Sequence, residues 1–93
     1  MVFEFDDNKS RSNKAKHGLD FIEAQAIWRD PELLDIPART VRGELRRAAI
    51  GRIGDRVWVA TYTERGTDDH QTIRLISTRR ARPREEARYH HDG

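Results

Sequence analysis

Arginine dominates the residues of this sequence that could do chemistry. Residues 39–93 hold thirteen Arg and no Lys, against eight Asp and Glu. Guanidinium groups bind phosphates in a bidentate way and stack on bases, whereas ammonium groups act as point charges. The arginines therefore indicate a ligand that carries phosphate. Composition leaves one alternative open, because a GC-rich genome favours arginine codons whatever the function.

The stretch from Thr72 to Asp92 holds the densest set of these groups. An apolar strand pattern carries Arg74 within it and ends on Arg79 and Arg80, and a polar helix is predicted from Pro83. An arginine inside an apolar strand needs either a carboxylate partner or an outward, functional face. The other candidates share a basic or titratable side chain, and they are Arg65, Arg84, Arg88, Tyr62, Tyr89, His17 and His90.

These groups suffice for the cleavage of RNA without a metal. A base takes the proton of the 2′-hydroxyl, which attacks the adjacent phosphate, and an acid protonates the leaving 5′-oxygen. Arginines stabilise the charge that develops on the phosphate. Histidine suits either proton transfer, and tyrosine does so only where neighbouring arginines lower its pKa. His17 also has a purely structural reading, as a cap at the end of a predicted helix.

Other classes of site are not indicated. The chain has no cysteine, which excludes disulfides, thiolate zinc sites and thiol nucleophiles. His90 and His91 are neighbours on a predicted helix and point about 100° apart, so we expect no metal site. No apolar run approaches the roughly 20 residues of a membrane span, and the N-terminus lacks the pattern of a signal peptide. We expect a cytoplasmic protein that needs no metal or other cofactor and does not contact the membrane.

The elements that must position these groups follow from local patterns. Hydrophobic residues make up 35% and charged residues 37%, so the core is thin and a two-layer arrangement fits it. Two helices are predicted near the N-terminus, over residues 9–17 and 20–28, the second with an Asp20–Glu23 capping box. A third helix follows Pro83.

Short strands fill the rest of the chain. They are predicted over residues 2–5, 33–36, 45–53, 56–63 and 71–80, with a Gly54-Asp55 hairpin turn and a polar loop over residues 64–70. The order predicts one α+β domain spanning residues 1–93. In it, an antiparallel sheet carries two N-terminal helices and a C-terminal helix, mainly on one face.

Several short motifs occur in a specific order along nearly the whole chain. They are Lys9-x-x-x-Asn13-x-x-Lys16-His17-Gly18, Asp30-Pro31, Glu44-x-Arg46, Ile50-Gly51, Tyr62-Thr63-Glu64-Arg65-Gly66, Ile73-Arg74-Leu75-Ile76-Ser77, Arg79-Arg80-Ala81, and Arg84-Glu85 followed by Tyr89. No single motif is diagnostic. The ordered set resembles the BrnT family of bacterial toxins.

The resemblance implies a RelE/ParE-like fold and the toxin of a type II toxin–antitoxin pair. It implies a metal-independent endoribonuclease that cleaves mRNA and blocks translation. It also implies a BrnA-like antitoxin, in a hetero-oligomer with two copies of each chain, which alone binds operator DNA. In this setting Arg74 and Arg79 are expected to contact the phosphate, and Tyr89 and His17 to transfer protons. The expected contacts to RNA are Arg65, Arg80, Arg84 and His90.

Two other readings belong to different classes. A toxin of the same fold could inhibit a protein target such as a topoisomerase, or the chain could be a non-catalytic component of an autorepressor complex. Incubation of the purified protein with RNA separates both from a ribonuclease.

Overall fold

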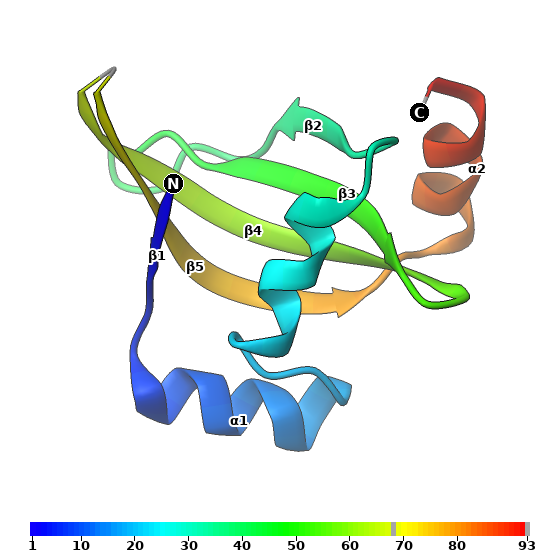
Figure 1. Ribbon diagram of the computed structural model, residues 1–93, viewed down its shortest axis with the longest axis horizontal. Helices are drawn as coiled ribbons and strands as arrows, with labels where there is room; N and C mark the ends of the chain where they lie inside the picture. The colour runs from blue at the N-terminus through cyan, green and yellow to red at the C-terminus, as the bar shows by residue number, and fades with distance from the viewer. Residues whose placement is uncertain (68, 93) are drawn as a thin grey trace.

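The computed structural model describes residues 1–67 and 69–92. The strands form one five-stranded sheet in the order β1-β5-β4-β3-β2, and three helices accompany it, which confirms the α+β class. The elements along the chain (Figure 1) are β1 (Val2–Glu4), α1 (Asp7–His17), the 3-10 helix η1 (Glu23–Arg29), β2 (Leu34–Pro37), β3 (Arg47–Ile53), β4 (Arg56–Thr67), β5 (His70–Arg80) and α2 (Pro83–Asp92).

The sheet is mixed, so the prediction of an antiparallel sheet is wrong at β1. This strand pairs in parallel with residues 72–74 of β5, whereas the other neighbouring strands are antiparallel. The local pattern predicted a strand here but held no information on its partner, which lies about seventy residues away. The pairing places Glu4 directly beside Arg74.

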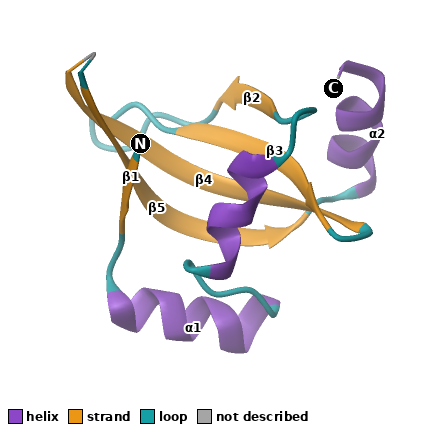
Figure 2. Ribbon diagram, viewed as in Figure 1, coloured by secondary structure: helices purple, strands orange, loops and turns teal. Residues whose placement is uncertain are grey.

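Each face of the sheet carries its own hydrophobic cluster. On the first face, buried residues of η1 and of the segment before it pack on Trp58, Ala60 and Tyr62. On the second face, Tyr89 of α2 packs on Val57 and Val59. The prediction that the helices lie mainly on one face therefore fails for α2, which stands apart from α1 and η1 at the other end of the sheet (Figure 2). Tyr89 is buried at this contact.

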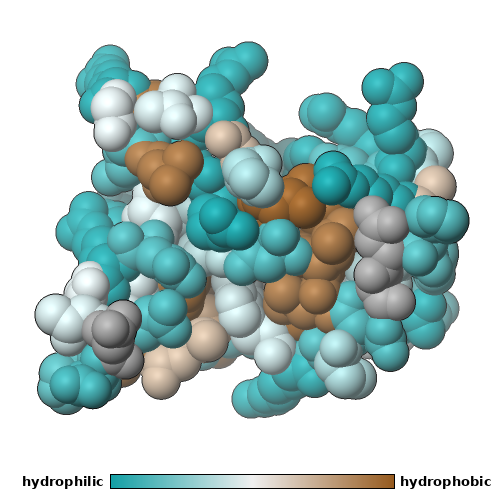
Figure 3. Space-filling view, turned by 90° about the horizontal axis from the view of Figure 1, so that it is seen from above, coloured by the Kyte–Doolittle hydropathy of each residue, from teal (hydrophilic) through white to brown (hydrophobic). Residues whose placement is uncertain are grey.

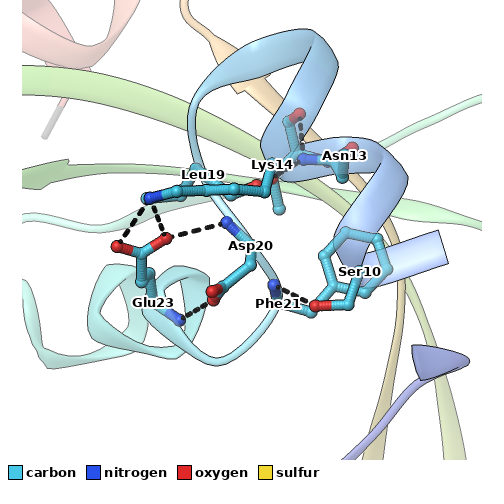
Figure 4. Close-up of polar contacts among 8 residues, drawn as sticks. Ser10, Asn13, Lys14, Leu19, Asp20, Phe21 and Glu23 are labelled. Carbon is cyan, nitrogen blue, oxygen red and sulfur yellow. Dashed lines mark hydrogen bonds and ion pairs between the residues drawn. The ribbon is translucent and has the colours of Figure 1, made fainter. Parts of the chain in front are cut away.

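Polar contacts rather than apolar packing hold α1, whose buried residues are Ser10 and Asn13. The Asn13 amide donates to the carbonyl oxygens of Thr78 (2.9 Å) and Leu19 (2.8 Å) and accepts from the Thr78 backbone N–H (3.2 Å). Asn13 thus provides hydrogen-bond partners for the backbone of β5 at Thr78, beyond the residues that pair with β1. Ser10 accepts from the Phe21 backbone N–H at 2.9 Å. Figure 4 shows these side chains between α1 and the start of η1.

The second predicted helix forms as a 3-10 helix. Its capping box is confirmed, since the Glu23 N–H donates to Asp20 (2.7 Å) and the Asp20 N–H donates to Glu23 (3.0 Å) (Figure 4). A 3-10 helix is narrower than an α-helix, and η1 lies very close to β3. A Cβ at Gly51 would stand only 3.0 Å from Ile27.

The predicted polar loop over residues 64–70 is wrong for residues 64–67 and 70, because β4 continues to Thr67 and β5 begins at His70. Asp69 is a turn residue, and residue 68 lies outside the described residues. This part of the hairpin is largely exposed, so it extends without the apolar alternation that marks a half-buried strand. A bulge between Thr61 and Tyr62 shifts the register within the same hairpin. Because β4 extends this far, Arg65 lies on a strand and pairs with Thr72. The other hairpin, around Gly54-Asp55, is confirmed by the pairing of Ile53 with Arg56.

Candidate functional site

Five charged side chains from different parts of the chain form a continuous row. The Oε1 atom of Glu4 lies 3.5 Å from Arg74 Nη1 and 3.7 Å from Arg65 Nη1. Glu44 in turn lies 4.0 Å from Arg65 Nη2 and 3.8 Å from Arg46 Nε. These residues, in the order Arg74, Glu4, Arg65, Glu44 and Arg46, are called the arginine row below. The row carries three positive and two negative charges.

Strand pairing directs the row to the face of the sheet that also carries α2. Arg74 pairs with Thr63 across β4 and β5, and paired residues point to the same face. Tyr62, the neighbour of Thr63, belongs to the first cluster. Because successive residues of a strand point to opposite faces, Thr63 and Arg74 face the other way.

A tight turn places Glu44. Val41 and Glu44 exchange two backbone hydrogen bonds of 3.0 and 2.9 Å, and the two residues between them have positive φ, 51° at Arg42 and 78° at Gly43. Positive φ at both central positions defines the turn that suits the twist of a hairpin. Arg42 is the only non-glycine residue with positive φ among residues 1–67 and 69–92. The turn thus holds a strained arginine two positions before a member of the row.

Gly66 keeps the strand beside Arg65 in place. Its φ of 104° is one that side chains rarely adopt, and a Cβ at this position would overlap the His70 carbonyl. The close approach of β4 and β5 here therefore requires glycine.

The ion pairs of the arginine row are loose. The four contacts measure 3.5 to 4.0 Å, and the side chains involved are 28 to 55% exposed. Exposed pairs of this kind contribute little to stability. The row's arginines can therefore exchange a carboxylate partner for a phosphate with little loss of folding free energy.

Arg79, a predicted phosphate contact, is bound much more tightly. Both of its terminal nitrogens donate to Glu85, each at 2.7 Å. Glu85 also accepts from the Arg82 backbone N–H at 2.8 Å. The hydrogen bond from Arg79 is the main cause that lowers the pKa of Glu85. This bidentate pair ties the end of β5 to the first turn of α2.

Arg79 nevertheless faces the same side of the sheet as the row. It pairs with Val59, a member of the second cluster. Regular alternation would put Arg74 and Arg79, five residues apart, on opposite faces, and the bulge brings them to one face. They remain about 16 Å apart along β5, given a rise of about 3.3 Å per residue.

Tyr89, a predicted proton-transfer residue, is buried, with 4% of its surface exposed. Its hydroxyl donates to Asp30 Oδ2 at 2.5 Å. Burial, together with this hydrogen bond, raises its pKa to about 12. Asp30 also accepts from the backbone N–H groups of Arg52 (2.7 Å) and Glu32 (2.8 Å). The hydroxyl of Tyr89 stays protonated near neutral pH and anchors α2 to the segment after η1.

The remaining predicted residues lie away from the row. Arg80 lies over the Trp58 ring, 5.7 Å from its centroid, on the face of the first cluster. His17 is exposed at the C-terminal end of α1, about 16 Å from the end of that helix nearest β1. Arg84 and His90 are exposed on α2. Of the predicted residues, Arg65 and Arg74 come together in the arginine row, and the rings of Tyr89 and His90 contact each other on α2, with centroids 5.3 Å apart.

Four residues of this region were not among the predicted site residues, and they are Glu4, Glu44, Arg46 and Thr63. The signal for three of them lay in the Glu44-x-Arg46 motif and in the run from Tyr62 to Gly66. Glu4 joins the row through the parallel pairing of β1, which no local pattern indicates.

A row of arginines interleaved with carboxylates on one exposed face suits the binding and cleavage of a phosphodiester. Residues 5–85 match the family model described as "Ribonuclease toxin, BrnT, of type II toxin-antitoxin system". The chain is therefore a ribonuclease toxin of a type II toxin–antitoxin system. Its family is BrnT, as the ordered motifs predicted. A search of curated proteins found no match.

The matched region contains most of the arginine row but ends before Tyr89, and it begins just after Glu4. Within residues 1–67 and 69–92, no helix is long and apolar enough to cross a membrane. The same residues hold no group of three or more His, Asp or Glu arranged to bind a metal ion.

Proposed function

We propose that this toxin is a metal-independent endoribonuclease that cleaves mRNA at the arginine row and so blocks translation. The observation that carries the proposal is the looseness of the row. Its arginines lie together on one exposed face and are paired only at 3.5 to 4.0 Å. A phosphate, which offers shorter bidentate hydrogen bonds, would displace the carboxylates.

The chemistry follows from that exchange. Arg65 and Arg74 bind the non-bridging oxygens of the scissile phosphate and stabilise the charge of the transition state. Glu4, which lies between them, takes the proton of the 2′-hydroxyl. The 2′-oxygen bonds to phosphorus and the bond to the 5′-oxygen breaks, with a proton from solvent completing the new 5′-hydroxyl. The other product end is a 2′,3′-cyclic phosphate.

Glu4 is not one of the residues that the sequence predicted for proton transfer, which were Tyr89 and His17. Tyr89 is buried and its hydroxyl is already bonded to Asp30, and His17 is exposed at the C-terminal end of α1, away from the row. Glu4 instead touches both Arg65 and Arg74. Arg79, Arg80, Arg84 and His90 then remain candidates for contacts with more distant parts of the RNA.

We further propose that a BrnA-like antitoxin neutralises the toxin, in a hetero-oligomer with two copies of each chain, and that operator DNA binds through the antitoxin. Apolar residues that are only half-buried surround the second cluster, on the same face as the row. Apolar residues also gather in the middle of the face seen in Figure 3, beside the end of the molecule where α2 lies. A partner bound there would lie on the same face of the sheet as the row. The proposed fold type remains RelE/ParE-like.

The test is the cleavage of end-labelled mRNA by purified toxin in the presence of EDTA. We expect wild-type cleavage with 2′,3′-cyclic phosphate ends, and a loss of about 100-fold or more for Arg74→Ala. Arg56→Ala, which removes an exposed arginine at the Ile53–Arg56 turn, is the matched control. Equal rates for the two variants would refute the proposed site. Growth arrest without RNA cleavage would point instead to a protein target such as a topoisomerase.

A further inference from the structure

Two buried polar atoms of the described residues have no hydrogen-bond partner, and they belong to neighbouring side chains. They are Thr63 Oγ1 and Arg46 Nε. Thr63 is only 2% exposed, so water does not reach its hydroxyl freely. Buried polar groups of folded proteins are normally hydrogen-bonded, and each exception requires a reason.

The Thr63 hydroxyl lies between Arg74 and Arg46, the two residues at the ends of the arginine row. Arg46 directly precedes β3, whose first residue, Arg47, pairs with Tyr62. Extending this register by one residue places Arg46 beside Thr63. On its other side, Thr63 pairs with Arg74. The hydroxyl of Thr63 therefore lies between two arginines of the row, beneath side chains held only by ion pairs of 3.5 and 3.8 Å.

Another buried threonine of the same sheet shows the ordinary arrangement. Thr78 is fully buried, and its hydroxyl accepts from the Asn13 amide and donates to the Leu19 carbonyl at 3.4 Å. Valine has almost the shape of threonine and would fill the position of Thr63 without burying an unpaired hydroxyl. The unpaired hydroxyl at Thr63 thus lacks the structural role that Thr78 has.

We propose that Thr63 Oγ1 and Arg46 Nε form a binding subsite for a phosphate oxygen of RNA. The hydroxyl and the Nε–H group each donate to that oxygen, and Arg74 binds the same phosphate from the other side. The subsite opens when the incoming phosphate displaces Glu4 and Glu44 from the arginines. It rests on the proposed function, because it adds two donors to the same cleavage site.

Thr63→Val tests the subsite because it removes the hydroxyl and little else. The ligand is a 2′-O-methyl RNA oligonucleotide, which lacks the attacking 2′-hydroxyl and so stays intact during a binding measurement by fluorescence anisotropy. We expect its affinity to fall about tenfold, as for the loss of one hydrogen bond to a charged group. The melting temperature should be unchanged or higher, since no folded-state hydrogen bond is lost. Thr63→Ser, which retains the hydroxyl, should restore most of the affinity.

Thr78→Val is the matched control. It removes a buried hydroxyl that has partners, so the melting temperature should fall while the affinity for the oligonucleotide stays that of the wild type. The two valine variants should therefore show opposite patterns. A single variant that merely misfolds would lose both stability and affinity.

Wild-type affinity in Thr63→Val would overturn the subsite, and an ordered water would then explain the unpaired hydroxyl. A lowered melting temperature in that variant would also overturn it, because the hydroxyl would then have a structural partner. If Arg74→Ala abolishes cleavage while Thr63→Val binds and cleaves normally, only the subsite fails. If the wild-type protein neither binds nor cleaves RNA, the proposed function fails with it.

Discussion

Glu4 and Arg74 are partners in the parallel pairing of β1 with β5, and their side chains meet at 3.5 Å between Oε1 and Nη1. Both side chains are about two-fifths exposed, at 40% and 38%. The pair therefore joins the first strand of the chain to the last one without burying either charge. Its weakness as a stabilising contact leaves both groups available for chemistry.

The first prediction concerns Glu4 as the proton acceptor. Glu4→Gln keeps the size of the side chain but cannot take the proton of the 2′-hydroxyl, so cleavage should slow by about 100-fold or more. Binding of a 2′-O-methyl RNA oligonucleotide should be retained or strengthened, because a negative charge leaves the row. Single-turnover kinetics and anisotropy measure the two effects. Glu86→Gln, which removes an exposed carboxylate on α2, serves as the control, and an equal rate in both variants would exclude Glu4 as the base.

The second prediction assigns Arg79 a mainly structural role. Arg79→Ala removes two hydrogen bonds of 2.7 Å and leaves Glu85 without its main partner, so the free energy of unfolding should fall by about 2 kcal/mol. Denaturant titration of Arg79→Ala, Glu85→Gln and the double variant measures the coupling between the two side chains. Additive effects of the two substitutions would show that the pair contributes nothing.

The pairing of Arg79 with Glu85 also predicts how the stability of the fold changes at acid pH. The pKa of Glu85 is lowered in the folded protein, chiefly by Arg79. Its contribution to stability is thus complete above the ordinary pKa of 4.5 and is lost as the pH falls through the lower, folded-state value. Arg79→Ala should show a smaller loss of stability below that pH than the wild type.

The third prediction concerns the stability that Tyr89 contributes at alkaline pH. A pKa raised from 10.0 to about 12 means that the folded protein keeps a proton that the unfolded chain loses. The hydroxyl therefore stabilises the fold fully below pH 10, and this contribution is lost as the pH rises to about 12. Tyr89→Phe should unfold about 1 kcal/mol more easily at pH 7 and show a flatter alkaline decline. Thermal unfolding from pH 8 upwards checks both effects. A wild-type alkaline profile in the variant would contradict the raised pKa.

Sequence patterns predicted those parts of this fold that neighbouring residues determine. The Asp20–Glu23 capping box, the Gly54-Asp55 hairpin and the start of a helix at Pro83 all rest on contacts a few residues apart. The mid-strand position of Arg74 indicated either a carboxylate partner or an outward, functional face, and Glu4 is a partner of the first kind. The sequence pattern thus predicted Arg74, the residue at one end of the arginine row, as part of the candidate site.

The other parts of the site depend on contacts that no local pattern encodes. Glu4 joins the row through a parallel pairing across almost the whole chain. Arg74 and Arg79 lie on the same face of the sheet because of the bulge between Thr61 and Tyr62. The hydroxyl of Tyr89 donates to Asp30, which lies 59 residues before it in the chain. Each of these is a long-range choice made by packing rather than by periodicity.

The fourth prediction uses the strain at Arg42. A residue with a Cβ is disfavoured at a φ of 51°, and glycine is not. Arg42→Gly should therefore raise the free energy of unfolding by about 1 kcal/mol. Arg42→Ala is the matched control, since it loses the same charge but keeps the Cβ and should give no such gain. Equal stability of the glycine and alanine variants would show that the turn stores no strain.

The last prediction separates the arginines that bind RNA from those that bind the protein itself. Each arginine that contacts a phosphate releases counterions, so its loss should make the plot of log affinity against log salt shallower by about 0.7 for a single strand. Arg65→Ala and Arg74→Ala should each reduce the slope by this amount, because both side chains are exposed and only loosely paired. Arg79→Ala should lower stability with a smaller change in slope, since its guanidinium is engaged by Glu85. Anisotropy titrations of a 2′-O-methyl RNA oligonucleotide from about 50 to 200 mM salt measure these slopes. A larger change of slope for Arg79→Ala than for Arg74→Ala would move the phosphate site from the arginine row to the end of β5.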